Sequence, residues 1–276
     1  MSNINLMQGD CLELMKNIPD GSVDLVLTDP PYGTTACKWD SVIPFEPMWE
    51  QLNRIIKPNG AICLFGSEPF SSALRMSNIK HFKYDWIWDK HNTNGFLNAK
   101  KRPLKRHENI SVFSVGTPVY IPQMEERGKP RQKGSYNKKN GNGDMVYGKF
   151  ENISVVNNLY YPTDILSFSN AKQKGKVHPT QKPVALLEYL IRTYTNDGET
   201  VLDFTAGSMS TVVACINTKR NCIAIEKDEH YFNVGCERVR NHILDNNIDL
   251  CYNQVCGGVV LWQNSKTEQA KDMDGF

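Results

Sequence analysis

The segment Ser22–Thr28 constrains the fold most, because it alternates and then runs apolar before stopping at Asp29-Pro30-Pro31-Tyr32. This pattern is typical of a buried strand. A prolyl pair can continue neither a sheet ladder nor a helix, so it stiffens the turn that holds Asp29 and Tyr32. In open α/β sheets the ligand crevice lies where central strands end. The sequence therefore predicts an α/β sheet with a functional site at this turn.

The turn carries groups that suit an exocyclic amine of adenine or cytosine, which is a poor nucleophile because its lone pair is delocalised into the ring. The carboxylate of Asp29 and the carbonyl of Pro30 can both accept hydrogen bonds from such an amine. The ring of Tyr32 offers a face on which a base can stack. The competing interpretation is an ordinary strand exit with a buried tyrosine. The next segment, Gly33–Asp40, is a candidate closing loop, although its Trp39 could equally belong to the core.

Four further segments, together with this turn, resemble the amino-group DNA methyltransferases that use S-adenosylmethionine, and specifically their permuted β group. The catalytic turn precedes the cofactor loop by about 170 residues, whereas most other methyltransferases have the loop first. The resemblance implies a doubly wound, mostly parallel sheet of the seven-stranded, Rossmann-like methyltransferase type with an inserted target-recognition region. It spans roughly residues 3–246, and the four segments are Gln8–Cys11, Ile62–Ser67, His178–Pro183 and Val201–Ser208.

The resemblance also implies an activity: site-specific transfer of a methyl group from S-adenosylmethionine, without a metal, to N6 of a flipped adenine in double-stranded DNA. The Asp form of the turn is associated mainly with adenine, and cytosine N4 is the alternative. Methylation of a ring carbon needs a thiolate that follows a proline, and this chain has no Pro-Cys dipeptide. An RNA or protein methyltransferase is a further alternative, against which the permuted order and the basic insertion argue.

The cofactor half begins with a strand that ends at Asp203, followed by a turn in which Gly207 lets the backbone approach a ligand. By resemblance, Glu226 accepts hydrogen bonds from ribose hydroxyls and Asp10 lies beside the adenine; an ordinary strand exit or helix cap is the alternative for both. The expected catalytic residues are Asp29, Pro30, Pro31 and Tyr32. The expected cofactor-binding residues are Asp10, Cys11, Asp29, His178, Thr180, Gln181, Lys182, Asp203, Phe204, Thr205, Gly207, Ser208, Glu226 and Lys227.

The cofactor loop departs from its relatives at two positions, because Met209 and Val212 stand where glycines are usual. A methionine side chain there could enter the cofactor pocket, and a β-branched Val212 could push the following helix away from the sheet. These substitutions support a further alternative, a DNA-binding homologue with impaired catalysis.

Positive charge is concentrated in two tracts, Lys100–His107 and Arg127–Lys149, although the net charge of the chain is only +2. Basic side chains beside a groove neutralise phosphates, which predicts contact with DNA; a solvated loop is the alternative. For His107 and Glu108 a structural role and a phosphate-proximal role both stay open. The expected DNA-binding residues are Lys100, Lys101, Arg102, Lys105, Arg106, Arg127, Lys129, Arg131 and Lys133.

The periodicity divides the chain into four parts. We expect residues 1–88 to form the catalytic half of the core, 89–176 a target-recognition insertion containing a core strand at 110–115, and 177–246 the cofactor-binding half. Residues 247–276 are expected to form a tail, with an edge strand at Val259–Trp262 and disorder from Gln263 to Phe276. Helices are expected at Cys11–Ile18, Phe45–Ile56 and Pro183–Tyr194, and further strands at Asn5–Asp10, Ala61–Phe65, Tyr84–Trp88, Ile110–Val115, Val201–Phe204 and Asn221–Glu226.

The sequence has no stretch of 18 apolar residues and no secretory signal at its start, which predicts no contact with membranes. Its eight cysteines are scattered, as in reduced cytosolic proteins. We therefore expect a cytoplasmic protein, of bacterial or phage origin. The resemblance further implies a homodimer and a cognate restriction enzyme as partner.

Overall fold

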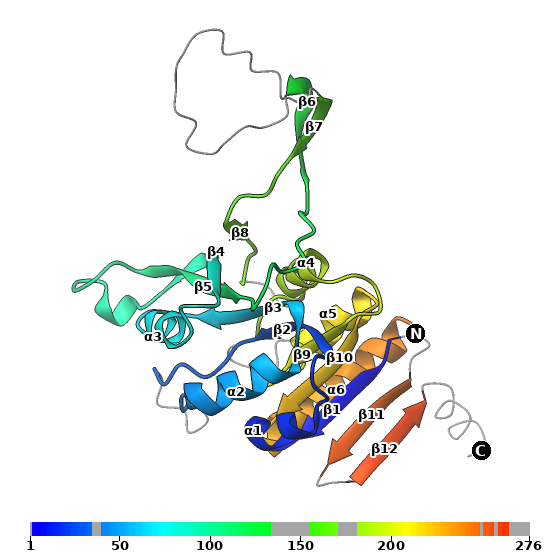
Figure 1. Cartoon of the computed structure of the whole chain (residues 1–276). Helices are drawn as coiled ribbons and strands as arrows, with labels where there is room; N and C mark the ends of the chain where they lie inside the picture. Colours follow the sequence, from blue (N-terminus) through cyan, green and yellow to red (C-terminus); the bar gives the residue numbers. More distant parts are fainter. Residues whose placement is uncertain are drawn as a thin grey trace. The chain divides into compact units, whose positions relative to one another are not determined.

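A ten-stranded sheet forms the centre of the part of the chain that the computed structural model describes (Figure 1). Described are residues 2–34, 40–133, 155–170, 181–248, 251–256 and 259–264, the last two ranges as backbone only. In spatial order the strands are β12 (Val259–Asn264), β11 (Cys251–Cys256), β1 (Ile4–Gln8), β10 (Asn221–Glu226), β9 (Thr200–Asp203), β2 (Val23–Thr28), β3 (Ile56–Gly66), β5 (Lys105–Phe113), β4 (Phe82–Asn94) and β8 (Ile165–Ser167).

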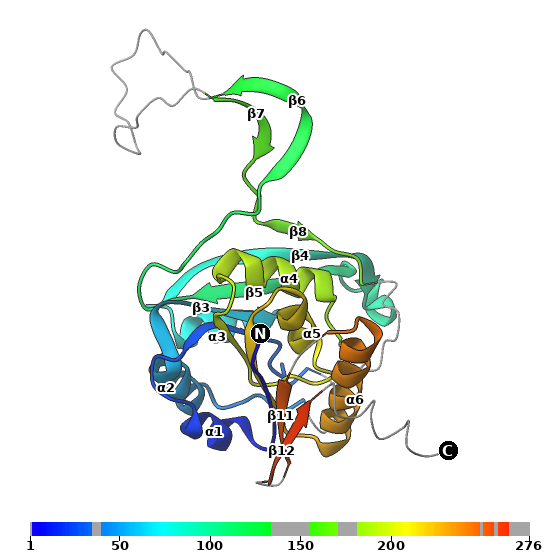
Figure 2. The same ribbon diagram turned by 90° about the vertical axis from the view of Figure 1, so that its right-hand side faces the viewer.

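Two layers of helices cover the two faces of this sheet (Figure 2). The apolar side chains of α4 (Val184–Tyr194), α5 (Ser210–Asn217) and α6 (Glu229–Asp245) pack on one face. Those of α1 (Cys11–Leu14), α2 (Phe45–Ile55) and α3 (Phe70–Ser77) pack on the other. Two short 3₁₀ turns, Met15–Asn17 and Phe96–Asn98, are the other helical elements among the residues described above. The expected doubly wound α/β fold is confirmed.

Strand β2 lies at the centre of the sheet, and every residue in it is buried. It pairs in parallel with β3 on one side and with β9 on the other. Both of its faces are covered by helices, which explains the nearly continuous apolar run before the Pro-Pro turn. The helix after β2 packs on one face of the sheet and the helix after β9 packs on the opposite face. The ends of β2 and β9 therefore form a topological switch point, where such sheets bind ligands.

Local sequence signals explain the helices that flank the site. Pro183 caps α4, as its fixed φ favours, and the apolar stripe of that helix packs into the core. Helix α2 buries Met48, Trp49, Leu52 and Ile55 and ends where β3 begins at Ile56. Strand β3 therefore begins earlier than the expected Ala61, because Ile56 already pairs with β2.

The segment expected to be a target-recognition insertion, 89–176, is divided between two compact units. Residues 122–163 form a unit of their own, in which β6 (Glu125–Lys133) pairs with β7 (Val155–Tyr160). Strands β4, β5 and β8 belong to the main sheet, so position 89 lies inside a core strand. A recognition role for 122–163 stays a prediction.

The C-terminal tail is more regular than expected. Strand β11 pairs in parallel with β1, and β12 pairs with β11 at the sheet edge. The edge strand expected at Val259–Trp262 is thus present and extends to Asn264. The prediction of disorder from Gln263 onward was therefore wrong for Gln263 and Asn264. Residues 265–276 lie outside the described residues. No helix in the described part of the chain is long and apolar enough to cross a membrane.

Candidate active site

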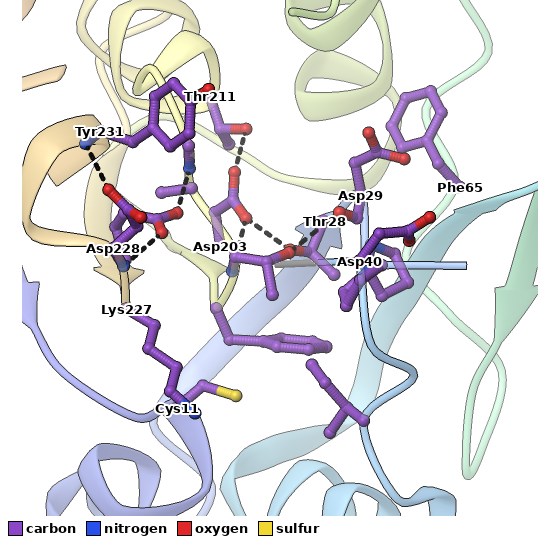
Figure 3. Close-up of a pocket in the computed structure, with 18 of the residues that line it drawn as sticks. Cys11, Thr28, Asp29, Asp40, Phe65, Asp203, Thr211, Lys227, Asp228 and Tyr231 are labelled. Atoms are coloured by element: carbon purple, nitrogen blue, oxygen red, sulfur yellow. Dashed lines mark hydrogen bonds between the residues drawn. The ribbon is translucent and has the colours of Figure 1, made fainter. Parts of the chain in front are cut away.

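A cavity of about 660 Å³ lies at the carboxyl ends of β2, β9 and β10 (Figure 3). Its size is within the range typical of small-molecule sites. The turn after β2, the loop after β9, the acidic end of β10 and the start of α1 all line it. The switch point of the sheet is therefore the site that the sequence predicted.

The carboxylate of Asp29 is held by hydrogen bonds at both of its oxygens. The hydroxyl of Tyr32 donates to Oδ1 at 2.5 Å, and the ammonium of Lys182 donates to Oδ2 at 2.5 Å. The Thr205 hydroxyl donates to the Asp29 backbone carbonyl at 3.1 Å. Burial raises the pKa of Asp29, and the positive charge of Lys182 opposes that rise. The catalytic turn is thus tied to the segment 181–183 and to the loop after β9.

Lys182 links Asp29 to a second partly buried carboxylate, Glu108 on β5. The Lys182 ammonium lies 3.4 Å from Glu108 Oε2, and Lys90 on β4 donates to Glu108 Oε1 at 2.9 Å. Burial alone would lower the pKa of Lys182, but the two carboxylates raise it, so Lys182 stays charged. Burial alone would raise the pKa of Glu108, but Lys182 and Lys90 hold it below its ordinary value. The sequence left both a structural and a phosphate-proximal position open for Glu108. The structure places its carboxylate beside the candidate site, paired with Lys182 and Lys90.

The ring of Tyr32 is stacked on Phe70 of α3, with centroids 5.0 Å apart and planes at 28°. Burial, followed by the charge of Asp29, raises the pKa of Tyr32 well above its ordinary value. The hydroxyl is therefore a permanent donor to Asp29. Stacking on Phe70 fixes the ring plane, which a flipped base would need as a platform.

Asp203 at the end of β9 organises the loops around the cavity. The hydroxyls of Thr28 and Thr211 donate to its two oxygens at 2.5 Å each, and the Thr205 amide donates at 3.2 Å (Figure 3). Burial raises the pKa of Asp203 to about 6. Its oxygens are thus engaged with the protein, joining β2, β9 and α5 where the three meet.

Glu226 at the end of β10 receives the backbone of the glycine loop. The Gly207 amide donates to Oε2 at 2.7 Å and the Asp228 amide donates to Oε1 at 2.8 Å. Gly207 has φ of +50°, a conformation that favours glycine. Burial raises the pKa of Glu226. This carboxylate lines the cavity at the position where an acid was expected to face ribose hydroxyls.

Asp10 is the N-cap of α1, because its carboxylate accepts from the Leu12 amide at 2.9 Å. It also lines the cavity and accepts from the Lys227 ammonium at 2.9 Å. The helix-cap interpretation is therefore correct and compatible with a place at the ligand. Beside it, burial raises the pKa of Cys11 to about 11, so this thiol is neutral.

Most residues expected to bind the cofactor line this one cavity; whether they bind it stays a prediction. His178, Thr180 and Trp39 lie outside the described residues. Lining residues that the sequence analysis missed include Thr28, Asp40, Thr211, Asp228 and Tyr231. The expected residues found in the lining are Asp10, Cys11, Asp29, Gln181, Lys182, Asp203, Phe204, Thr205, Gly207, Ser208, Glu226 and Lys227, together with Pro30, Pro31 and Tyr32.

Asp40 was not marked by any local pattern in the sequence. Its carboxylate accepts from the amides of Gly33 and Thr34 at 2.8 and 2.9 Å, seven and six residues earlier in the chain. It thereby fixes the exit of the turn that carries Asp29.

The suggestion that Met209 enters the cofactor pocket was wrong. Met209 is fully buried in the hydrophobic core, outside the cavity lining, and its side chain lies against Gly235 of α6. Val212 is also fully buried, in the same cluster. Arg238 of α6 donates to the Ser208 carbonyl at 2.8 Å, so α6 holds the loop closely. The structural reason to expect impaired cofactor binding is therefore removed.

The residues expected to contact DNA have different surroundings. Lys100, Lys101 and Arg102 are exposed at the tip of the β4–β5 hairpin. Lys105 is hydrogen-bonded to Ser67, and Arg106 forms two hydrogen bonds of 2.7 Å with Asp89. In the other unit, Arg127 and Lys133 lie over the ring of Tyr160, while Lys129 and Arg131 are exposed.

The lining of the cavity suits a cationic nucleoside. It contains seven carboxylates and two lysines, so its formal charge favours a ligand that carries a sulfonium and an amine. Carboxylates of Asp10 and Glu226 are suitable acceptors for hydroxyl and amine donors. S-adenosylmethionine has these groups, and the residues present fit it. Among the described residues no cluster of acidic, histidine or cysteine side chains could hold a metal.

The fold and this site define a Rossmann-like methyltransferase. A family model described as DNA methylase matches residues 23–237, so the chain belongs to this family of S-adenosylmethionine-dependent amino-methyltransferases. The family assignment, the fold and the cofactor expected from the sequence are confirmed; the choice between N6 and N4 methylation is left to the proposal below.

The chain is 25% identical to the type II methyltransferase M.HpaI of Haemophilus parainfluenzae, covering 92% of this chain and 82% of that protein. Among solved structures it is similar to the M1.HpyAVI–SAM complex, with a TM-score of 0.55 and 25% identity over 85% of this chain and 99% of that one. It is also similar in fold to the cytosine-N4-specific PvuII DNA methyltransferase, with a TM-score of 0.63 and 19% identity over 90% and 89%.

Proposed function

We propose that this DNA methyltransferase transfers the methyl group to the exocyclic N6 of an adenine in a specific sequence of double-stranded DNA. The observation that carries the proposal is the Asp29 carboxylate, fixed on a rigid turn in the cavity lining next to the loop after β9. When bound, S-adenosylmethionine supplies an electrophilic methyl group. The choice of adenine over cytosine rests on the Asp form of the turn.

The residues of the turn have separate roles in this proposal. A flipped base stacks on Tyr32, whose ring is braced by Phe70. Its amine donates to Asp29 and to the Pro30 carbonyl, which keeps the nitrogen lone pair available for attack. Asp29 also stabilises the positive charge that develops on the nitrogen. A covalent intermediate with the protein is not required.

The β4–β5 hairpin supports contact with DNA beside this site. β4 runs antiparallel to β5, β5 antiparallel to β3, and β3 parallel to β2. The end of β4 therefore points to the same edge of the sheet as the end of β2, and the hairpin tip extends beyond that edge (Figure 1). The tip exposes Phe96 and Leu97 together with three cations. Cations would neutralise phosphates there, and the apolar side chains would contact bases or sugars.

One experiment tests the activity and the base together. The protein is incubated with unmethylated DNA and S-adenosylmethionine, the DNA is digested to nucleosides, and the products are identified by mass spectrometry. Detection of N6-methyladenine supports the proposal, whereas detection of N4-methylcytosine would change only the target base that it assigns. Absence of a product on unmethylated genomic DNA, from a folded protein that binds the cofactor, contradicts the proposed activity.

A further inference from the structure

Each oxygen of the Asp29 carboxylate already accepts a short hydrogen bond in the structure. The Tyr32 hydroxyl donates to one and the Lys182 ammonium donates to the other, both at 2.5 Å. A carboxylate oxygen can accept a second hydrogen bond, so a base amine that donates to Asp29 either shares an oxygen with one of these donors or displaces that donor. Displacing Tyr32 would disturb a ring that is stacked on Phe70. The donor that can move more easily is therefore Lys182.

A second acceptor for the Lys182 ammonium is already in place. Glu108 Oε2 lies 3.4 Å from Lys182 Nζ, is buried, and accepts no hydrogen bond within the described part of the chain. The other oxygen of Glu108 accepts from Lys90, whose side chain is only 5% exposed. Lys90 thus fixes the carboxylate and leaves Oε2 directed to Lys182. Oε2 thus has an ion pair with the ammonium but no hydrogen bond from it. A buried acceptor without a hydrogen bond is unfavourable, so a closer and better aligned contact with Lys182 would stabilise it.

Two aromatic rings line the short path between the two carboxylates. Lys182 Nζ lies 5.1 Å from the ring centroid of Phe65 and 5.8 Å from that of Trp88. Ring faces at such distances attract an ammonium, so Lys182 keeps favourable contacts while its hydrogen bond changes partner. Trp88 is itself fixed, because its indole N–H donates to the Phe168 carbonyl at 2.8 Å.

We propose that Lys182 moves between two carboxylates during the reaction, and that Glu108 is the residue that receives it. Without DNA, Lys182 occupies Asp29 Oδ2. When the base amine enters, the ammonium shifts to Glu108 Oε2, and the amine takes its place on Asp29. Lys182 remains near enough to Asp29 to favour the ionised carboxylate. Glu108 is then a positioning residue for catalysis that touches neither substrate nor cofactor. The inference rests on the proposed function, because it requires an amine that binds Asp29.

The direct test is a crystal structure of the wild-type protein with S-adenosylhomocysteine and a duplex that contains its target sequence. The wild-type methylation assay comes first, and sequencing that detects methylated bases in the intact product DNA identifies the target sequence; if no base is methylated, the proposed function itself fails. With an active protein, we expect Lys182 Nζ within hydrogen-bond distance of Glu108 Oε2 and the base amine on Asp29. An ammonium that stays on Asp29 Oδ2 with the base bound overturns the inference while leaving the proposed function intact.

Kinetics test the role of Glu108 separately. Glu108→Gln keeps the size of the side chain but removes the charge that receives Lys182. We expect kcat to fall about tenfold, with KM for DNA and Kd for S-adenosylmethionine changed less than about threefold. The matched control is Glu188→Gln, a carboxylate on α4 that is about as exposed as Glu108 but pairs with Arg192 outside the cavity lining, and it should leave kcat unchanged.

The same substitution in a Lys182→Met background distinguishes positioning from general damage. With no ammonium to receive, Glu108→Gln should lower kcat no further in that background. An equal loss in both backgrounds, or no loss in either, contradicts the inference. If Glu108→Gln fails to fold, the wild-type structure with duplex still decides, because it needs no variant.

Discussion

Met209 lies directly against the backbone of Gly235: a Cβ at Gly235 would come within 2.4 Å of Met209 Cγ and 3.1 Å of the Gly207 carbonyl oxygen. Met209 has φ of +59°, in the left-handed region where glycine is usual. A glycine is thus missing from the cofactor loop and present on the helix that packs against it. The fit lets a methionine occupy the loop while its side chain fills the core instead of the cavity.

Gly235→Ala should lower the free energy of unfolding by about 1 to 3 kcal/mol, because the new methyl group overpacks a filled core. Since that methyl group also presses on Gly207, cofactor affinity should fall with it. Denaturant unfolding and calorimetric binding of S-adenosylmethionine measure the two effects. Met209→Gly removes the clash with the methionine side chain, so Gly235→Ala should cost less stability in a Met209→Gly background than in wild type. An equal cost in both backgrounds would count against this explanation.

Met209→Gly alone should not improve cofactor binding. The variant relieves a left-handed conformation but deletes a buried side chain, so we expect a net destabilisation of about 1 to 3 kcal/mol. Kd for S-adenosylmethionine should stay within about threefold of wild type, as measured by calorimetry. Markedly tighter binding would mean that Met209 does obstruct the pocket.

Asp29→Ala should abolish methyl transfer while leaving cofactor binding nearly unchanged, because the carboxylate contacts the amine and not the cofactor in the proposed mechanism. Single-turnover methylation with radiolabelled S-adenosylmethionine measures the first, and equilibrium binding the second. Asp29→Asn keeps the shape of the side chain and serves as the matched variant. Substantial turnover in either would refute the assigned role.

Tyr32→Phe and Tyr32→Ala should separate hydrogen bonding from stacking. The phenylalanine variant keeps the ring on Phe70 but loses the donor to Asp29, so kcat should fall by up to about tenfold with DNA binding unchanged. The alanine variant also loses the platform, which is worth about 1 to 3 kcal/mol per stacked base. Steady-state kinetics on target DNA compare them; equal effects would argue against stacking.

The protein should become less stable as the pH rises through the range in which Asp203 loses its proton. Burial raises its pKa from 3.8 to about 6 in the folded state, so the folded protein binds the proton more tightly than the unfolded chain. The contribution of this proton to the free energy of unfolding is complete below about pH 4. It is lost as the pH rises to about 6, a difference of about 3 kcal/mol.

Asp203→Asn removes this titration, and it supplies the comparison because other groups also titrate. The free energy of unfolding is measured at pH 4.5 and pH 7.5 in both proteins. Wild type should lose more stability than the variant between these values. The same change in both would mean that Asp203 titrates normally.

Lys100→Gln, Lys101→Gln should weaken DNA binding and reduce its salt dependence. Two lost phosphate contacts lower the slope of log K against log salt by about 2, which fluorescence anisotropy at several salt concentrations measures. The matched control is Lys80→Gln, Lys83→Gln, which removes two exposed charges at the opposite end of β4. Equal effects of the two pairs would exclude a specific role for the hairpin tip.

The sequence predicted the parts of the site that follow from strand ends. β9 and β10 end in Asp203 and Glu226, and Asp29 directly follows the end of β2. Each of the three strands carries a clear apolar run with an acid at or just after its end. Parallel strands place their carboxyl ends at the same edge of the sheet. The motif after one strand therefore predicts where the acids at the ends of the other strands lie. The α4 helix was equally clear because Pro183 and a continuous apolar stripe mark it.

Long-range side-chain pairs could not be predicted in the same way. Glu108 directly follows the basic tract Lys100–His107, whose composition suggests a surface. Only the pairing of β5 with β3 and β4 turns it toward Lys182. The partnership of Met209 with Gly235 has the same origin, because 26 positions separate the two in the sequence and a helix contact joins them. Spacing alone carries no information about either pair.

The position of β2 also has a consequence for synthesis on the ribosome. One of its two neighbours, β3, follows soon after it, but the other, β9, begins only at Thr200. Until that strand has emerged, the nascent chain carries the catalytic strand as an open, apolar sheet edge. Such an edge pairs readily with other chains. Fragments that stop before residue 200 should therefore associate with themselves or with chaperones, and only a chain that includes β9 can cover this edge of β2.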